Sequence, residues 1–515
     1  MKYVRYSSPL SCIYATVDST SSYNPPDEDI FLTSCLKTNI DMLQNIFVDN
    51  PYIIVREFTF HENIQMVLIY FNGLIDVTNI QNFILRASSS IREEQISFQW
   101  SDSDSIIQFV KQHIVTIGNI THTSNVKDIV EAIFLGNTIL LFESQLEACI
   151  ISTGGGEKRS ITEPTSQNVV RGPRDGFTES LQTNIVLIFR RIKNPKLRIK
   201  TKTIGTITHT NIALLYVKDI VDPTILNETL HRIDKITIDG VLESANVEPY
   251  LLDIGYSPFP TIYHTERPDI VASALLEGRI AIVVDGTPFV LLAPSLFQHF
   301  LQSNEDYYQP VYFSLFIRFL RYFSFFGSMI LPGLFIAITC FHQEMIPTPL
   351  LINLAAQRAS VPFPPIIEMF LMEVTFEIFR EAGIRLPRTV GSAISIVGAL
   401  VIGDAAVQAG IVSPATIIIV AFSAITNFVF PIYALSLITR LLRFVFLFFA
   451  SVLGLYGIMI GVILLLIHLC GVHSLGTVYF NSSSHRQERL LRKAHSSIDQ
   501  PTFLMKWKAY YQKWR

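Results

Sequence analysis

The sequence is poor in cysteine, and its cysteines follow no recognisable spacing. The 515 residues contain five cysteines, none within a CxxC motif, so neither a disulfide framework nor a zinc site is predicted. The twelve histidines are dispersed along the chain, and the HExxH and GxSxG motifs are absent. We therefore predict no enzyme activity, no bound metal and no cofactor.

Charge is also scarce, and it is distributed unevenly. Charged residues make up 16% of the chain, against about 25% in typical soluble domains. Residues 1–310 hold 24 basic and 35 acidic residues, residues 311–472 hold eight arginines, no lysine and six acidic residues, and residues 473–515 hold eight basic and two acidic residues. This distribution excludes a disordered chain and a nucleic-acid-binding protein, and it indicates an acidic soluble domain, a membrane domain and a basic tail.

The long hydrophobic runs all lie in the second half of the chain. A helix needs about 20 apolar residues to cross ~30 Å of hydrocarbon, and four runs reach that length: 322–341, 390–411, 415–437 and 444–470. Four crossings place the acidic domain and the basic tail, residues 473–515, on the same side of the membrane. We predict that this side is the cytoplasm, because residues 1–22 lack the sustained apolar run of a signal peptide.

One further segment, residues 366–385, is apolar apart from regularly spaced charges. Glu373, Glu377 and Glu381 recur every four residues, so they share one face of a helix. Because unpaired carboxylates are costly in hydrocarbon, we predict an amphipathic or re-entrant helix whose glutamates face water or form an acidic vestibule. Two alternatives stay open: the segment is a fifth crossing, or the glutamates pair with Arg380, Arg385 or Arg388.

The soluble half contains an internal repeat. IALLYV in the second copy parallels MVLIYF in the first, and DIVASALLEG parallels DIVEAIFLGN. Tyr70 and Tyr216 lie 146 positions apart, and Gly136 and Gly278 lie 142 positions apart, so two tandem copies of one unit are predicted. In both copies, short β-branched runs alternate with helical patterns, which indicates an α/β fold.

These patterns predict an α/β soluble N-terminal domain, made of two similar subdomains, followed by an α-helical transmembrane bundle. The linker between the copies is rich in glycine, proline, serine and threonine. The predicted parts are a flexible leader over 1–29, cytosolic subdomains over 30–153 and 178–310, a linker over 154–177, and a membrane domain over 311–472.

The second predicted span, residues 390–411, is rich in small residues and holds one acid. One helical face carries small side chains on which another helix could pack closely: Ala399, Gly403, Ala406 and Gly410. The neighbouring face carries the candidates for a pore or gate: Ala393, Val397, Leu400 and Asp404. The alternative for this acid is a helix-end position in headgroup water. In the last predicted span, the GxxxG pair of Gly457 and Gly461 is predicted to pack against another helix.

Four long stretches of the chain resemble one protein family. They are RGPRDGFTESLQTNIVLIFRRIKNPKLRIK at 171–200, TERPDIVASALLEGRIAIVVDGTPFVLLAP at 265–294, FHQEMIPTPLL at 341–351 and VPFPPIIEMFLMEVTFEIFREAGIRLP at 361–387. They resemble the A subunit of the GerA family of spore germination receptors. The resemblance implies a germinant receptor in the inner membrane of a bacterial endospore.

The same resemblance implies the partners and the activity. In the family, the A subunit works with a transporter-like B subunit and a lipoprotein C subunit, and it is thought to oligomerise into a nutrient-gated ion channel in contact with membrane lipid. From the residues alone, a secondary transporter and a structural scaffold stay open as alternatives. A transporter usually has more spans and a repeat within the membrane region, whereas the repeat found here lies in the soluble half.

Overall fold

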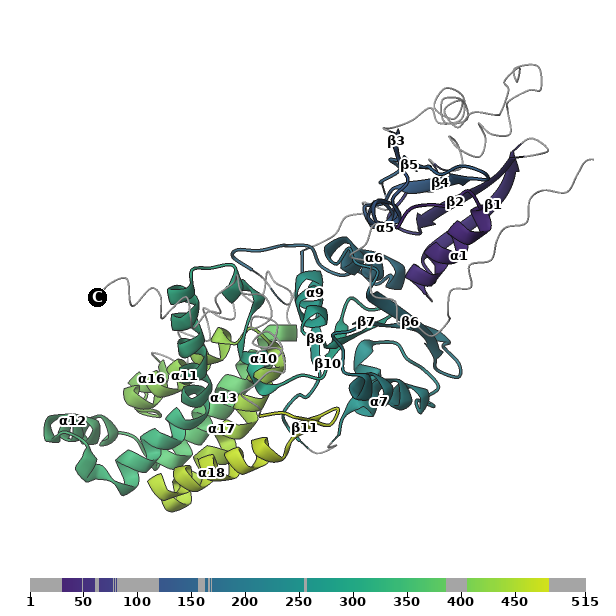
Figure 1. The fold of residues 1–515 in the computed structure, drawn as a ribbon. Helices are drawn as coiled ribbons and strands as arrows, with labels where there is room; N and C mark the ends of the chain where they lie inside the picture. The colour runs from purple at the N-terminus through teal and green to yellow at the C-terminus, as the bar shows by residue number, and fades with distance from the viewer. Residues whose placement is uncertain are drawn as a thin grey trace, which may run out of the picture.

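A computed structural model describes residues 30–80, 120–155, 163–253, 257–385 and 405–480, apart from positions 49, 61–63, 77, 79, 165, 166 and 168. The described chain forms two α/β subdomains in tandem, followed by a bundle of helices (Figure 1). The predicted leader, residues 1–29, and the tail from residue 481 onward lie outside the described residues.

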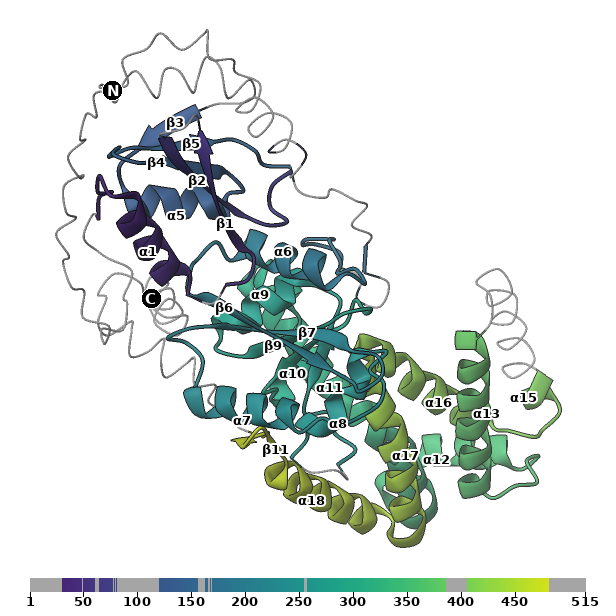
Figure 2. The same cartoon turned by 90° about the vertical axis from the view of Figure 1, so that its right-hand side faces the viewer.

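The first subdomain is built on a five-stranded antiparallel sheet. Its strand order is β1-β2-β4-β5-β3, and two helices pack their apolar faces against the sheet (Figure 2). The elements are α1 (Leu36–Phe47), β1 (Ile53–Phe60), β2 (Ile64–Phe71), β3 (Ile120–Thr123), α5 (Val126–Phe134), β4 (Thr138–Phe142) and β5 (Ala148–Ile151).

The second subdomain has a sheet of the same size. Its strand order is β6-β7-β9-β10-β8, again antiparallel throughout. The elements are α6 (Leu181–Arg191), β6 (Leu197–Ile204), β7 (Thr210–Val217), α7 (Pro223–Asp234), η5 (Ser244–Asn246), α8 (Glu248–Leu251), β8 (Tyr263–Thr265), α9 (Pro268–Leu276), β9 (Ile280–Val284), β10 (Val290–Ala293), α10 (Phe297–Leu301) and η6 (Asn304–Tyr307).

The two subdomains repeat one topology, which confirms the predicted duplication. The strands follow each other in the same order in the two sheets. Gly136 and Gly278, matched by sequence, have backbone φ angles of +85° and +86°. A Cβ atom at either glycine would lie 2.8 Å from a backbone carbonyl oxygen, that of Leu74 or Ile220 respectively. Both positions therefore need glycine for the same two reasons, a left-handed backbone and a close approach of the chain.

A pair of buried asparagines repeats in the same way. Asn39 accepts a hydrogen bond from the backbone N–H of Thr33 and donates one to its carbonyl oxygen. Asn184 makes the same two bonds to Thr178. The turn that leads into the first helix of each copy is thus held by one side chain, and its backbone groups stay satisfied.

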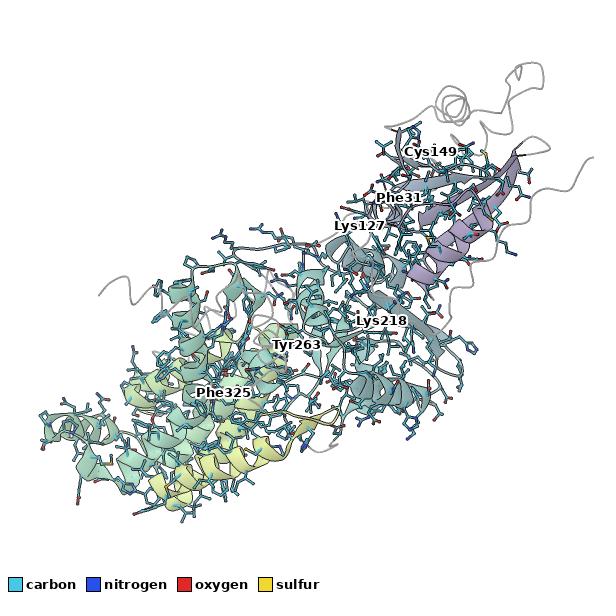
Figure 3. All side chains as sticks on the ribbon, viewed as in Figure 1. Phe31, Lys127, Cys149, Lys218, Tyr263 and Phe325 are labelled. Atoms are coloured by element: carbon cyan, nitrogen blue, oxygen red, sulfur yellow. The ribbon has the colours of Figure 1, made fainter. Side chains whose placement is uncertain are left out.

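One apolar core runs through both subdomains into the helical region. Phe189 of α6 stacks on Phe134 of α5 with ring centroids 5.9 Å apart and lies 4.8 Å from the ring of Phe71. The same cluster of buried side chains includes Tyr263 of the second sheet and Phe325 of α11 (Val311–Ile336) (Figure 3). Because the two subdomains and the helical region share this buried core, we expect them to move together.

The helical region follows the second subdomain directly. Its elements after α11 are a π-helical turn (Ala337–Phe341), α12 (Thr348–Arg358), α13 (Pro365–Arg385), α15 (Ala406–Gln408), α16 (Pro414–Thr426), α17 (Tyr433–Leu453), α18 (Leu455–Gly471), β11 (His473–Ser474) and β12 (Thr477–Val478). Among the described residues, two helices are long and apolar enough to cross a membrane, Val311–Phe341 and Tyr433–Leu453.

The helix bounds differ from those of the predicted spans. The predicted span 415–437 is divided near Pro431, which separates α16 from α17 because proline has no backbone N–H to donate. The predicted span 444–470 is divided at Gly454, whose φ of +60° turns the chain from α17 into α18. The spans were predicted from the length of the apolar runs, and neither Pro431 nor Gly454 interrupts an apolar run, so both breaks were missed. The number of membrane crossings stays a prediction.

The contacts between helices give their directions. α11 and α17 run side by side away from the second subdomain, since Phe325 contacts Phe430 near it, and Phe341 contacts Gly454 at the far end. α18 returns, because its His468 ring packs 6.0 Å from that of Phe259 in the second subdomain. α13 and α16 also run toward the second subdomain, as their contacts with α17 and with each other show.

The chain after α18 docks on the second subdomain. The hydroxyl of Ser474 donates to the carbonyl oxygen of Thr261 and accepts from the backbone N–H of Ser295, at 2.7 and 3.0 Å. Tyr479 is fully buried and packs among aromatic rings that include Phe297. Both ends of the helical region are therefore attached to the same subdomain.

Candidate functional site

A buried ion pair lies at the centre of the helical bundle. The guanidinium of Arg443 on α17 contacts Glu373 of α13 at 2.6 Å, and the two side chains are 1% and 0% exposed. The same guanidinium donates to the carbonyl oxygens of Ser328 on α11 and Ser423 on α16, at 2.9 and 3.2 Å. The hydroxyl of Ser423 donates to the other oxygen of Glu373. One arginine therefore connects four helices.

A second ion pair lies one turn nearer to the second subdomain. Arg440 donates to Glu377 at 2.9 Å, and its guanidinium lies 5.7 Å from the ring of Tyr433. Arg380 of α13 donates to the hydroxyl of Ser436 at 2.9 Å. Glutamates four residues apart on α13 thus face arginines three residues apart on the antiparallel α17, so both pairs form along one helix contact.

The prediction that all three glutamates face water is wrong for Glu373. Its carboxylate is enclosed by α16 and α17 and neutralised by Arg443. Periodicity placed the glutamates on one face of α13, but it gave no information about which other helix carries the opposite charge. Glu381 is exposed, and with Glu377 and Phe444 it lines an open groove of about 440 Å³.

Sequence reasoning missed a fourth glutamate on the same helix. Glu368 is 1% exposed, and one carboxylate oxygen accepts from both the backbone N–H and the hydroxyl of Ser413, each at 2.6 Å. This contact satisfies a donor at the start of α16, where the helix dipole favours negative charge. The spacing gave no signal for it, because Glu368 precedes Glu373 by five residues, which places it about 140° around the helix from the face of the other three glutamates.

All four predicted pore or gate residues lie outside the described residues: Ala393, Val397, Leu400 and Asp404. Two of the predicted packing residues, Ala399 and Gly403, lie outside them as well. Ala406 begins the short α15 and is half-buried. Gly410 lies in a turn with φ of +67°, where a Cβ atom would be 3.1 Å from the carbonyl oxygen of Ser360. Gly410 is thus a turn glycine and does not form part of a helix face as the spacing predicted.

The GxxxG glycines of α18 face α17. A Cβ atom at Gly457 would lie 2.0 Å from the carbonyl oxygen of Phe449, and one at Gly461 would lie 2.9 Å from the ring of Phe446. Any larger side chain at either position would push the two helices apart, because the atoms it would meet belong to packed backbone and ring.

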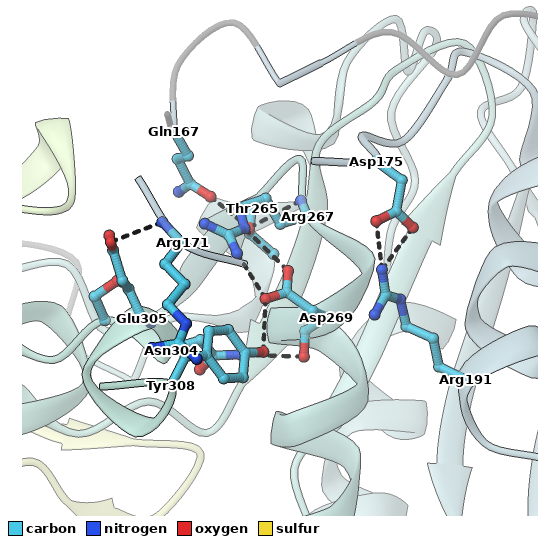
Figure 4. A network of polar contacts seen from close by, with 11 residues as sticks. Gln167, Arg171, Asp175, Arg191, Thr265, Arg267, Asp269, Asn304, Glu305 and Tyr308 are labelled. Carbon is cyan, nitrogen blue, oxygen red and sulfur yellow. Dashed lines mark hydrogen bonds and ion pairs between the residues drawn. The ribbon is translucent and has the colours of Figure 1, made fainter. Parts of the chain in front are cut away.

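A second polar network joins the second subdomain to the start of the helical region (Figure 4). Arg267 donates to both carboxylate oxygens of Asp269 at 2.9 and 2.6 Å, and both side chains are almost fully buried. The hydroxyl of Tyr308 donates to Asp269 at 3.1 Å, and the side chain of Asn304 donates to its backbone carbonyl at 3.1 Å. The N-terminus of α9 is thereby fastened to the η6 turn.

The linker between the subdomains joins this network. The hydroxyl of Thr265 donates to Gln167, and the backbone N–H of Arg171 donates to Glu305 of η6 (Figure 4). Further along, Arg191 of α6 pairs with Asp175 of the linker. The linker therefore contacts both α6 and η6.

The other side of η6 holds α11. Asp306 is 2% exposed at its side chain and accepts from Arg321 at 2.6 Å and from Arg318 at 3.2 Å. The hydroxyl of Ser314 donates to the backbone carbonyl oxygen of Asp306. A turn of four residues thus links α9 to α11 through buried charged hydrogen bonds, which are stronger than neutral ones.

Titratable groups beside this turn are strongly influenced by burial. Burial raises the pKa of Tyr263 to about 12. Burial, together with the positive charge of Arg279, holds the pKa of His299 well below its usual value. Arg279 itself is 7% exposed and donates to Pro294 and Ser295. His299 is therefore neutral at physiological pH, and its Nδ1 atom accepts from the backbone N–H of Leu296.

Within the part of the chain that the structure describes, no group of three or more histidine, cysteine, aspartate or glutamate side chains could hold a metal ion. Most polar groups of the two networks have arginine, carboxylate, hydroxyl or backbone partners, whereas Oε1 of Glu377, Nη1 of Arg380 and Nε of Arg191 are buried without a hydrogen-bond partner. Both networks can therefore hold helices in place, and the bundle network additionally places charge inside an apolar region.

Comparison with known proteins identifies the family. The family model described as Bacillus/Clostridium GerA spore germination protein matches residues 41–508. Spore germination protein KA of Bacillus subtilis (strain 168) is 46% identical over 88% of this chain and 83% of its own length. Spore germination protein GerLA of Bacillus cereus is 38% identical over 81% of this chain and 83% of its own length.

A solved structure is also similar to the soluble half. It is the N-terminal domain of the A subunit of the Bacillus megaterium spore germinant receptor GerK3, with 30% sequence identity, a TM-score of 0.42, and coverage of 52% of this chain and 98% of that one. The family match extends over both subdomains and the helical region. The chain belongs to the GerA family of spore germination proteins, among the relatives of its A subunits.

Proposed function

We propose that this chain is the A subunit of a nutrient germinant receptor in the spore inner membrane. In this proposal it works with a transporter-like B subunit and a lipoprotein C subunit, and it oligomerises to form or gate an ion-conducting path that triggers germination. The soluble subdomains and the basic tail lie on the cytoplasmic side. The family membership supports the role in germination. The ion-conducting path goes beyond family membership and is argued below.

The proposed ion path is supported by the two ion pairs inside the helical bundle, Glu373–Arg443 and Glu377–Arg440. Transferring a charged pair into a low-dielectric interior costs several kcal/mol, and apolar residues of similar volume would often hold helices together as well. Glu373 and Arg443 are nevertheless buried at the midpoint of α17. Ionisable groups at membrane depth typically mark an ion path or its gate.

The second predicted span remains our candidate for the wall of the path. α13 ends at the level of Ser436, near the second subdomain, whereas Gly410 packs against Ser360 beyond α12, at the opposite end of the bundle. The described residues on the two sides of the second predicted span therefore lie at opposite ends of the bundle. We place Val397 and Leu400 at an apolar constriction and Asp404 near its mouth, with Ala393 on the same face.

The η6 turn supplies a connection from the soluble subdomains to this path. It holds α9 through Asp269 and α11 through Asp306, so movement of the second subdomain would pull on the first helix of the bundle. In secondary transporters the internal repeat usually lies in the membrane region, whereas in this chain it lies in the soluble half. A scaffold would not require a buried ion pair.

Conductance tests the proposal directly. The purified chain in a planar bilayer should show single-channel currents, and Val397→Ala and Leu400→Ala should raise the open fraction by admitting water to the constriction. In spores, the same variants should release ions without nutrient at normal subunit abundance. Val452→Ala, on an exposed position of α17, is the matched control.

Three results would refute parts of the proposal. A chain that carries no current alone or with its partner subunits is a scaffold. Saturable uptake of a solute without current indicates a transporter. Normal abundance with unchanged nutrient dependence in both constriction variants removes the second span from the path and leaves it in ordinary bundle packing.

A further inference from the structure

A small cavity lies between the second subdomain and the η6 turn. Its volume is about 40 Å³, and its lining comes from β8, α9, α10, η6 and the turn before β9. A buried water needs about 10–15 Å³, so the cavity has room for about three waters or for one carboxylate group. Tyr307, one of the lining residues, is 61% exposed, so small solutes can reach the cavity from solvent.

The cavity contains a buried arginine without a counter-ion. Arg279 is 7% exposed, and it donates from Nε to the carbonyl oxygen of Pro294 and from Nη2 to the hydroxyl of Ser295, both of which are uncharged. It forms no ion pair with any residue that the structure describes. Burial lowers the pKa of Arg279, although the charge of Glu277, which lines the same cavity, counteracts this shift. A buried charge in this state is costly until a partner neutralises it.

The free polar groups at the cavity are hydrogen-bond donors. Nε and one N–H of Nη2 of Arg279 are used, so the parallel N–H bonds of Nη1 and Nη2 remain, and such a pair matches both oxygens of a carboxylate. His299 lines the cavity as well. Burial holds the pKa of His299 well below its usual value, and its Nδ1 accepts from Leu296. The ring is therefore neutral with its proton on Nε2, which is a second donor.

The first subdomain shows that the fold does not require this arginine. Matched residues of the two sheets are 142 positions apart, so Asn137 of the first copy corresponds to Arg279. The backbone N–H of Asn137 donates to Ala132 at 3.0 Å, and that of Arg279 donates to the matched Ala274 at 3.1 Å. A neutral side chain is thus sufficient for the turn, and the charge in the second copy needs a different explanation.

We propose that Arg279 and His299 bind a small carboxylate anion in this cavity. The carboxylate supplies the counter-charge that Arg279 lacks and accepts from Nε2 of His299. A doubly charged anion fits less well, because Glu277 at the same cavity would repel it. Ser303 and Asn304 also line the cavity, at the start of the η6 turn. A bound carboxylate would therefore brace the turn that holds α9 and α11.

Thermal unfolding of the full chain in detergent tests the site. Sodium acetate is the probe, and sodium chloride keeps the ionic strength constant at neutral pH. Arg279→Asn introduces the residue that the first copy has at this position. His299→Asn keeps an acceptor for Leu296 and removes Nε2. Arg174→Asn is the matched control, because Arg174 is a surface arginine whose side chain is 62% exposed.

The unfolding midpoint of the wild type should rise with acetate and then saturate, as expected for a ligand that binds the folded state. Arg279→Asn should raise the acetate concentration of half effect by at least about tenfold, because hydrogen bonds to a charged donor are the strong ones. His299→Asn should weaken the effect less, and Arg174→Asn should behave as the wild type does. If Arg279→Asn is not recovered folded, line broadening of ¹³C-labelled acetate by the wild type, and its reduction by His299→Asn, tests the same contact.

Three outcomes would overturn the inference. Equal rises in the wild type and Arg279→Asn would show a general effect of the salt on stability. A wild-type midpoint that does not respond to acetate would leave Arg279 with a structural role alone. A stronger, Arg279-dependent rise with sodium sulfate would assign the cavity to a doubly charged anion. None of these measurements involves conductance, so this inference and the proposed function fail separately.

Discussion

At the scale of single residues, the buried pair of Glu373 and Arg443 has the largest expected effect on stability. Removing one partner of a fully buried pair leaves an uncompensated charge, which costs about 3–5 kcal/mol. Glu373→Gln or Arg443→Met should therefore lower the unfolding midpoint of the chain in detergent and its abundance in the membrane. The double variant Glu373→Met with Arg443→Met should be more stable than either single variant, because no unpaired charge remains.

Glu381→Gln provides the control for this comparison. Glu381 lies on the same helix and carries the same charge, but it is exposed, so its contribution is screened by solvent and should be within about 1 kcal/mol. A loss of stability in Glu381→Gln as large as that in Glu373→Gln would show that burial does not distinguish the two glutamates.

His299 predicts a dependence of stability on pH. Its pKa in the folded chain is held well below the ordinary value of about 6.5, first by burial and then by Arg279. The folded chain therefore binds a proton at His299 more weakly than the unfolded chain does. Above pH ~6.5 His299 is neutral in both states, and the folded state keeps its full stability. As the pH falls below ~6.5, the unfolded chain takes up the proton first, so stability is lost.

Unfolding midpoints at several pH values measure this effect. His299→Asn, whose side-chain oxygen can accept from the N–H of Leu296, should weaken the loss of stability between neutral and mildly acidic pH. Part of the slope should persist, since burial also lowers the pKa of His264. If the unfolding midpoint of His299→Asn depends on pH as steeply as that of the wild type, His299 is not a source of the pH dependence.

At the scale of elements, η6 is the connection between the soluble subdomains and α11. Asp306→Asn removes the charge that holds Arg318 and Arg321, so we expect α11 to be less firmly held. The expected result is a weaker nutrient response of the spores at normal subunit abundance. Ion release after nutrient addition, with the subunit quantified in the same spores, measures it.

Glu305→Gln is the matched control on the same turn. Its side chain accepts from the N–H of Arg171 and from Gln309 and holds neither arginine of α11. A glutamine keeps an acceptor oxygen at this position, so the response should stay close to that of the wild type. A wild-type response in Asp306→Asn at equal abundance would exclude η6 as the connection.

At the scale of the whole molecule, both ends of the helical region are fastened to one subdomain. α11 starts at η6, and the hairpin of β11 and β12 after α18 bonds to Thr261 and Ser295. Ends held on the same subdomain lead us to expect an even number of membrane crossings, as in the prediction of four.

Tags at the two termini test this arrangement. An epitope before residue 30 and another after residue 480 should both be protected from added protease in sealed right-side-out vesicles and both be cleaved after permeabilisation. Protection of one tag alone would contradict the docking of the hairpin. A tag inserted between α11 and α12, at the opposite end of the bundle, should be cleaved without permeabilisation.

Much of the architecture could be predicted from periodicity and repetition. The matched Gly136 and Gly278 located the duplication, because each glycine has a backbone conformation that side chains disfavour. The helical region could be recognised from its lack of charge. The breaks at Pro431 and Gly454 could not be recognised in the same way, because hydropathy averages over the residues that turn the chain.

The amino-acid sequence by itself determined the class of each half, the tandem repeat and the face of α13 that carries glutamates. These features follow from local spacing, and local spacing sets which side chains share a face. Only the tertiary structure decided that Arg443 neutralises Glu373, that Asp306 holds α11, and that the chain after α18 returns to Thr261. Those contacts join residues 15 to 213 positions apart, and one-dimensional periodicity carries no information about which distant element supplies the partner.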